Sequence, residues 1–294
     1  MNSIEAINKS TWSEKWAEYR KRPGSFIMFI FVHLATLITV LSIGFLLVYV
    51  LVKGIPNLNA DIFSWEYTSD NCSLVPALIN TVYMTLLSLL IAGPIGIFAA
   101  IYLVEYAKTG NKLVGVVRIT AETLTGIPSI VYGLFGMLFF TNACGLRLSL
   151  ISGALTLAIM VLPVIMRTTE EALMAVPKSY REGSFGLGAG KLRTVFKVVL
   201  PSAVPGILSG IILATGRIVG ETAALIYTAG SVAKMATKLT DSTRTLAVHM
   251  YLLSKEGLHT DQGYATAVVL LVLVVLINFA SDKIAGKVAA DKAN

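Results

Sequence analysis

The sequence has few of the residues from which catalytic and metal sites are commonly built. Only 14% of its 294 residues are charged, and it contains two cysteines and three histidines. Cys72 and Cys144 are too few for a disulfide framework or a zinc site, and the histidines are far apart in the chain. We therefore expect no metal site, no cofactor bound by this chain and no catalytic residue. A cleavable leader is not expected either, because the first apolar run is much longer than the core of a signal peptide.

Apolar residues, in contrast, are in excess. They make up 55% of the chain, against about 45–50% in soluble domains, and the mean hydropathy is +0.74. Six apolar stretches are each long enough to cross about 30 Å of hydrocarbon as a helix. They predict an all-α, multi-pass membrane protein with six transmembrane helices at about 26–52, 75–103, 124–141, 148–166, 202–227 and 264–281. Pro94 and Pro163 fall inside two of these stretches and predict kinks rather than breaks.

The distribution of basic residues predicts the orientation of the chain. With both termini in the cytoplasm, seventeen of the 24 Lys and Arg residues lie on the inner side, six on the outer side and one inside a span. Cytoplasmic loops carry such an excess, so the net charge of +7 requires no nucleic-acid partner. We expect a location in the cytoplasmic membrane of a bacterium or archaeon. Cys72 and Cys144 then both lie outside, where they either form a disulfide or are two unrelated thiols.

Composition divides the chain into four parts. Residues 1–25 predict a cytoplasmic helix at the membrane interface, or alternatively a disordered tail. Residues 26–73 hold the first transmembrane helix and an outer loop, and residues 74–282 form a core domain with the other five transmembrane helices. Residues 283–294 are a cytoplasmic tail.

An inner loop of the core domain, residues 167–201, contains the most specific pattern in the chain. Its segment EGSFGLGAGKLRTVFKVVLP (182–201) resembles the EAA motif of ABC importer permeases: E-A-A, three residues, glycine, nine residues, and then I-x-L-P. Gly and Ser replace the two alanines, and Val replaces the isoleucine. The resemblance implies a short coupling helix that docks on a cytoplasmic ATPase. The residues that match are Glu182, Gly183, Ser184, Gly188, Val198, Leu200 and Pro201.

The glycine-rich part of this loop is not a nucleotide-binding P-loop. Phe185, immediately before GLGAGKL (186–192), occupies the place of the first glycine, and Leu192 occupies the place of the Ser or Thr that follows the lysine. We therefore expect no enzymatic activity in this chain. ATP is expected to be hydrolysed by a partner subunit.

Three segments resemble one particular family of ABC importer permeases. GIPSIVYGLFG (126–136), RTTEEALMAVPKSYREGSFGLGAG (167–190) and GRIVGETAALIYTAG (216–230) resemble the PstA family of phosphate-specific permeases. The resemblance implies a type I ABC importer (MetI-like) permease fold, with 74–282 as the permease core and inorganic phosphate as substrate. It also implies a PstC-like companion permease, two copies of a PstB-like ATPase and a PstS-like phosphate-binding protein outside the membrane.

Other readings remain open. A permease of the same fold could carry another oxyanion, such as sulfate or molybdate, and only the segment around Arg217 argues against this. An anion transporter driven by an ion gradient would predict an inverted repeat, which the sequence does not show. A membrane scaffold or receptor would have no need of a charge inside a span.

Arg217 and Glu221 are the residues for which we expect a role in the substrate path. A charge at bilayer depth costs roughly 2.5–3.5 kcal/mol on insertion scales, and two residues four apart share one face of a helix. They could form a structural salt bridge. Alternatively, Arg217 contacts phosphate near mid-membrane, because a guanidinium matches its oxygens. Glu221 would then orient Arg217 and favour release of the anion.

Other charged residues near the inner loops are expected to be less important. We expect Glu105 and Glu122 to be solvated or at the level of the lipid headgroups. Arg167, Glu170 and Glu171 predict either the start of a cytoplasmic helix with an acidic first turn or a part of the surface on which the ATPase docks.

Overall fold

The computed structural model describes residues 23–108 and 110–290. These residues form helices joined by turns, and the described part of the chain contains no β-strand. The predicted interfacial segment lies outside the described residues except for its last three positions. Five helices are long and apolar enough to cross a membrane, and a bent pair of helices makes a sixth if the pair counts as one span. The all-α, multi-pass prediction is thus confirmed.

The chain divides into two compact units, Met1–Val52 and Lys53–Asn294. The described part of the first unit belongs to helix α2 (Pro23–Gly54), and none of the residues in its most apolar window is buried. A helix that is apolar on every side is suited to lipid or to contact with another apolar surface. The assignment of separate roles to 26–73 and 74–282 remains a prediction.

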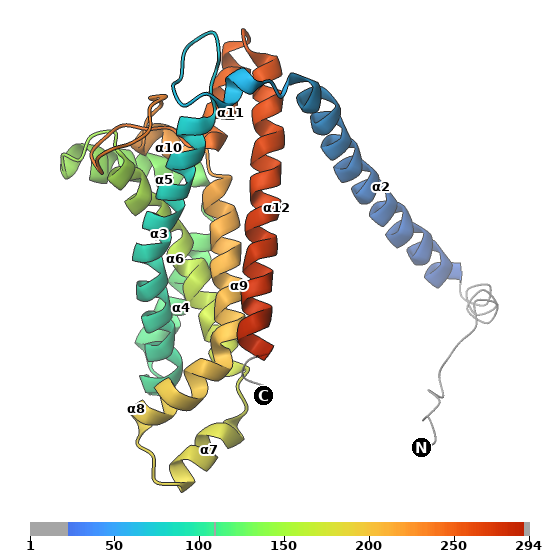
Figure 1. Cartoon of the computed structure of the whole chain (residues 1–294). Helices are drawn as coiled ribbons and strands as arrows, with labels where there is room; N and C mark the ends of the chain where they lie inside the picture. The colour runs from blue at the N-terminus through green and yellow to red at the C-terminus, as the bar shows by residue number, and fades with distance from the viewer. Residues whose placement is uncertain (1–22, 109, 291–294) are drawn as a thin grey trace. The chain divides into compact units, whose positions relative to one another are not determined.

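The second unit contains all the other elements (Figure 1). Two short 3-10 turns, η1 (Ile55–Asn57) and η2 (Ala60–Phe63), precede the first long helix. The elements that follow are α3 (Val75–Ile101), η3 (Tyr102–Tyr106), α4 (Lys112–Thr125), α5 (Ser129–Gly136), η4 (Met137–Ala143), α6 (Leu150–Met174), α7 (Lys178–Gly186), α8 (Lys191–Thr194), η5 (Val195–Val199), α9 (Leu200–Val219), α10 (Ala223–Thr228), α11 (Leu246–Glu256) and α12 (Thr260–Ala290). Of these, η3, η4 and η5 are π-helical continuations of neighbouring α-helices. Helix α12 continues past residue 283, where the cytoplasmic tail was predicted to begin.

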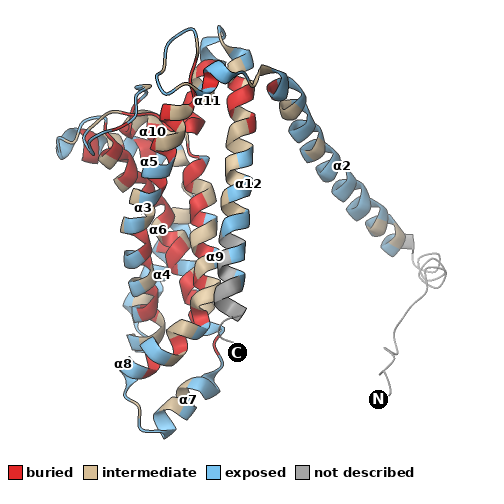
Figure 2. Ribbon diagram, viewed as in Figure 1, coloured by how far each residue is buried: buried red, intermediate tan, exposed pale blue. Residues whose placement is uncertain are grey.

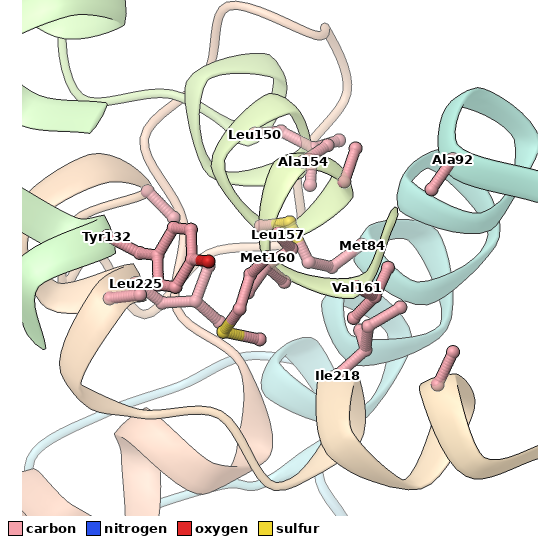
Figure 3. Packing of buried hydrophobic residues seen from close by; sticks show 14 of the residues in the cluster. Met84, Ala92, Tyr132, Leu150, Ala154, Leu157, Met160, Val161, Ile218 and Leu225 are labelled. Carbon is pink, nitrogen blue, oxygen red and sulfur yellow. The ribbon is translucent and has the colours of Figure 1, made fainter. Parts of the chain in front are cut away.

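Helix α6 is the centre of the core. Two-thirds of its span, 67%, is buried, more than in any other candidate span of the described chain. Side chains from α3, α6 and α9 converge around it, among them Met84, Leu157 and Ile218 (Figure 3). A second cluster packs the other ends of the same three helices and includes Ile101, Leu173 and Ile207. Burial is therefore concentrated where these helices face one another (Figure 2).

The third predicted span, 124–141, is wrong as a straight helix. The chain bends by 104° between α4 and α5–η4, at Gly126–Pro128. Pro128 has no N–H with which to continue the helical bond to the carbonyl of Leu124, and a proline disfavours helical geometry in the residue before it. The Leu124 carbonyl accepts instead from the Ile127 N–H at 3.2 Å and from the hydroxyl of Tyr132 at 2.8 Å. The bend therefore leaves this carbonyl with a partner.

The fifth predicted span, 202–227, is also interrupted. Helix α9 ends at Val219, and α10 begins at Ala223. In contrast, α3 and α6 continue through Pro94 and Pro163, so the prediction that these prolines do not break their helices is confirmed.

Glycine allows α5 and α10 to pack in direct contact at the end of the molecule where α11 also lies (Figure 1). A Cβ atom built on Gly133 would lie 2.8 Å from the Cα of Ala224 and 3.2 Å from two backbone oxygens. Backbone atoms cannot move aside as a side chain can. Small residues at such contacts are typical of helix packing in membranes.

We expect Gly133→Ala to destabilise the protein by about 1–3 kcal/mol, the usual cost of overpacking. Gly115→Ala is the matched control, because a Cβ atom at this helical position would meet nothing within 4 Å. Thermal unfolding of the purified protein in detergent measures both effects. Equal melting temperatures for the two variants would contradict the close contact between α5 and α10.

Candidate functional site: a projecting helix and an arginine between two helices

Helix α7 projects from the end of the second unit opposite α5 and α10 (Figure 1). It falls in the predicted coupling segment, and none of its residues is buried. Tyr180 and Phe185 are about half exposed, at 52% and 47%, and Leu187 is 91% exposed. A projecting helix with exposed aromatic and aliphatic side chains has the form of a docking surface.

The turn after α7 explains the glycine at position 188. Gly188 has a φ of +81°, which residues with a Cβ rarely adopt. The Ala189 N–H donates to the Ser184 carbonyl and the Gly188 N–H donates to the Phe185 carbonyl, the two bonds of a Schellman cap. A Cβ at Gly188 would meet nothing within 4 Å in this chain. Backbone conformation within the chain, rather than a close contact, therefore requires this glycine.

The other predicted coupling residues have different positions. Glu182 and Gly183 are exposed on α7. The Ser184 hydroxyl is 2.8 Å from that of Thr194, which attaches α7 to α8. Leu200 and Pro201 are the first two residues of α9, and the helical path from Lys191 to Val219 runs through α8, η5 and α9 without a break. The segment after the projecting helix thus leads directly into a membrane span.

Arg217 and Glu221 do not share one helix. Arg217 lies in the last turn of α9, whereas Glu221 lies in the break before α10. The Glu221 carboxylate is buried and accepts a hydrogen bond from the Ala224 N–H at 3.1 Å, so it caps the start of α10. Within the described chain Arg217 forms no ion pair, and the predicted alternative of a structural salt bridge is wrong.

The half-buried Arg217 lines a groove between α9 and α12. The other lining residues include Ser209 and Gly216 of α9 and Asn278 of α12. A Cβ at Gly216 would meet nothing within 4 Å, so there is open space next to the arginine. The groove thus combines a permanent positive charge with a hydroxyl and an amide in a part of the chain that is otherwise apolar.

Two predictions about charged residues at the α7 end of the molecule are wrong. Glu105 is not solvated: its side chain is 8% exposed and pairs with Arg181 at 2.6 Å. Arg167, Glu170 and Glu171 do not start a helix, because α6 continues through all three to Met174.

A charged cleft between α4 and α6 accounts for these residues. Arg118 of α4 pairs with the buried Glu170 of α6, and Arg167 bonds to Glu171 at 3.2 Å and to Glu122 at 3.5 Å. Glu122 itself is 70% exposed, as expected for a solvated residue. Only the Arg167–Glu171 pair, four residues apart, could have been found from sequence spacing.

The opposite end holds a buried polar cluster that sequence reasoning missed. The Asn80 amide donates to the carbonyls of Lys234 and Arg244 and accepts from the Ala236 N–H. The buried Arg244 guanidinium lies over the ring of Tyr67, 4.5 Å from its centroid, and His249 meets the same ring edge-on. These contacts order the loop between α10 and α11.

The two cysteines are not bonded to each other. Cys72 is buried and Cys144 is exposed, and both are free thiols. The disulfide alternative is therefore not formed.

The fold and the projecting helix define a class: a helical, multi-pass membrane protein with a short exposed helix between two of its spans. Comparison with known proteins identifies the family. Residues 92–290 match the model of the binding-protein-dependent transport system inner membrane component. The chain belongs to this family.

Sequence relatives and a solved structure agree with this family assignment. The chain is 33% identical over 270 residues to a probable ABC transporter permease protein, YqgI, of Bacillus subtilis, covering 84% of this chain and 90% of the relative. It is 40% identical over 179 residues to the phosphate transport system permease protein PstA of Xylella fastidiosa, covering 60% of this chain and 62% of that protein, less than two-thirds of its length. A structure of the MetNI methionine ABC transporter superposes with a TM-score of 0.56 at 25% identity, covering 71% of this chain and 93% of that one.

These similarities confirm the predicted fold class, the permease fold of MetI-type ABC importers. The chain is a non-enzymatic, multi-pass subunit of the inner membrane. Transport of this kind requires a separate ATPase, a substrate-binding protein and a companion permease.

The buried cluster around His249 makes stability depend on pH. Burial, together with the neighbouring Arg244 cation, lowers the pKa of His249 from its ordinary 6.5 to about 3. The unfolded chain therefore binds a proton below pH 6.5 that the folded chain does not bind until about pH 3. Stability is complete above pH 6.5 and falls as the pH drops below it, by about 1.4 kcal/mol per pH unit from this residue alone.

We expect His249→Phe to remove this contribution, so that melting temperature falls less steeply between pH 7 and pH 5. His259→Gln, immediately before α12, is the control and should retain the pH dependence of the unchanged protein. Identical pH profiles for His249→Phe and the unchanged protein would show that His249 is not buried in its neutral form.

Proposed function

We propose that this chain is the PstA-like permease subunit of an ATP-driven importer of inorganic phosphate. Half of the translocation path would be formed by this chain and the other half by a PstC-like companion permease. Two PstB-like ATPase subunits would supply ATP hydrolysis, and a PstS-like protein would deliver phosphate from outside. Both termini lie in the cytoplasm in this proposal, and the chain itself holds no cofactor.

The observation that carries the proposal is the unpaired charge of Arg217 beside an open groove. A guanidinium in a membrane-spanning helix is costly unless a partner compensates it. The nearest acid in sequence, Glu221, is committed to the Ala224 N–H instead. Arg217 therefore keeps its donors for another acceptor, and the planar fork of a guanidinium fits the oxygens of phosphate.

The neighbouring groups suit a transient site. Asn278 adds an amide that can donate to an oxyanion, whereas the Ser209 hydroxyl donates to the Pro205 carbonyl at 3.1 Å, and neither residue adds a second positive charge. A single cation binds phosphate less tightly than a cluster would, and conduction requires sites that release their ion. The similarity to the Xylella PstA protein supports phosphate as the oxyanion. In this proposal Glu221 acts by holding the break after α9 in place, rather than by pairing with Arg217.

Coupling to the ATPase is assigned to α7 and its glycine turn. The exposed face of α7 would dock on the ATPase through Glu182, Gly183 and neighbouring apolar side chains. A displacement of α7 would then reach Arg217 through α8, η5 and α9, which form one continuous helical path.

We expect Arg217→Gln to reduce phosphate uptake at least tenfold in proteoliposomes that hold the assembled complex. Assembly and basal ATP hydrolysis should persist, because the exchange removes a charge and leaves the helix intact. Arg147→Gln, an exposed arginine outside the spans, is the matched control and should transport normally. Near-normal uptake by Arg217→Gln would overturn the proposed role of Arg217.

Two further arms sharpen this test. Glu221→Gln keeps an oxygen acceptor for the Ala224 N–H and should retain uptake, whereas a role in charge pairing would make it as defective as Arg217→Gln. Competition by unlabelled sulfate or molybdate tests the alternative oxyanions. If sulfate or molybdate inhibits uptake strongly and unlabelled phosphate inhibits it weakly, the inhibiting oxyanion rather than phosphate is the substrate.

We expect Gly188→Val to uncouple transport from the ATPase, because a β-branched residue at positive φ costs on the order of 1–3 kcal/mol and would displace the turn. Glu182→Lys should have the same effect through the docking face. Gly186→Ala is the control, because it lies two residues earlier in helical backbone with open space around it. Membrane insertion is followed by fractionation and ATPase binding by co-purification. Normal uptake by both Gly188→Val and Glu182→Lys would refute the coupling assignment.

A further inference from the structure

Helix α7 is attached to the rest of the chain by polar contacts rather than by a buried apolar face. None of its residues is buried, although it lies at the end of a tightly packed bundle. A hollow separates part of it from the end of α3 and is lined by Val104, Met174 and Lys178, among others. One attachment is the Ser184–Thr194 hydrogen bond to α8. The other is Arg181.

The guanidinium of Arg181 contacts two further elements. Its Nε and Nη2 atoms donate to one Glu105 oxygen, at 3.0 Å and 2.6 Å, and Glu105 lies in η3 at the end of α3. Its Nη1 donates to the Val176 carbonyl and its Nη2 to the Leu173 carbonyl, each at 2.9 Å. Leu173 lies in the last turn of α6 and Val176 lies two residues past its end, where a helix leaves carbonyl oxygens without i+4 partners. One side chain of α7 thus joins the ends of two core helices.

Burial makes the Arg181–Glu105 ion pair costly to break. The side chains of Arg181 and Glu105 are only 17% and 8% exposed, so removing either one leaves a largely desolvated charge without its partner. A lysine could not replace the arginine, because one ammonium group cannot reach three acceptors in the geometry of the planar fork. Beside the pair, the Lys191 ammonium lies 5.1 Å from the centre of the Tyr106 ring, which also holds α8 near η3.

We infer that Arg181, through Glu105 and the end of α6, transmits movement of α7 to α3 and α6 as well as to α9. It is a positioning residue for coupling, and the inference rests on the coupling role proposed above for α7. Helix α7 is connected to α9 by the continuous backbone of α8 and η5, whereas Arg181 connects α7 to α3 and α6 through side-chain contacts. Leu173 and Val176, whose carbonyls accept from Arg181, belong to one apolar cluster together with Leu103, which lies two residues before Glu105. A push on α7 therefore moves the inner ends of α3, α6 and α9 together.

The experiment compares Arg181→Met with Arg147→Met in the assembled complex. Both exchanges remove one positive charge, but Arg147 is exposed and lies outside α7 and the spans, whereas the side chain of Arg181 is only 17% exposed. Radiolabelled phosphate uptake and ATP hydrolysis are measured on the same proteoliposomes. We expect the phosphate transported per ATP to fall about tenfold for Arg181→Met and to stay unchanged for Arg147→Met, with Arg181→Lys close to Arg181→Met. Equal ratios for Arg181→Met and the unchanged complex would overturn the inference.

Glu105→Gln tests the same route without altering α7. It should lower the ratio, and the double variant Arg181→Met with Glu105→Gln should be no worse than Arg181→Met alone, because residues that act through one contact are not additive. If Arg181→Met fails to assemble, Glu105→Gln decides: an assembled complex with a normal ratio overturns the inference. Failure of the coupling role itself is distinguishable, because Gly188→Val and Glu182→Lys would then transport normally.

Discussion

The packing of α3 and α9 against α6 is the constraint on which the rest of the structure depends. Helix α6 is the most buried candidate span of the described chain, and both large apolar clusters draw side chains from it. Lipid provides little hydrophobic drive for helices to associate, so close fit between small and branched side chains has to supply it. A rigid helix at this centre gives the charged and polar groups at both ends a fixed frame.

Different contacts form at the two ends of α6. At one end its last carbonyls and Glu170 receive the guanidinium groups of Arg181 and Arg118, so that α7 and α4 are positioned by charge. At the other end, α5 and α10 are too short to span a membrane and pack in direct contact at Gly133. In the proposed function, movement at the first end reaches the second along α9, whose last turn carries Arg217.

Two helix breaks lie near the proposed substrate path, and polar side chains form hydrogen bonds with the backbone groups at both. The bend at Gly126–Pro128 removes the i+4 donor of the Leu124 carbonyl, which accepts from the Ile127 N–H and the Tyr132 hydroxyl. The break after Val219 frees the first N–H groups of α10, and Glu221 satisfies one of them. In each case a nearby polar side chain is used to complete the backbone hydrogen bonding, as hydrocarbon surroundings demand. Arg217 is left without such a partner, and this sets it apart from Arg118, Arg167 and Arg181, each of which is paired with a glutamate.

The apolar runs were enough to predict the fold class, and the resemblance of residues 182–201 and of three further segments was enough to predict the family. These features are local, because a run of apolar residues crosses a membrane and a glycine at positive φ ends a helix whatever surrounds them. Only the tertiary structure decided the partners of charged residues. Glu105 and Arg181 are 76 positions apart in the chain, and nothing in their separation indicates that η3 and α7 meet. The same holds for Glu221, whose choice between Arg217 and the Ala224 N–H depended on where α9 ends. It also holds for Arg244 and His249, whose burial depends on tertiary packing around α11.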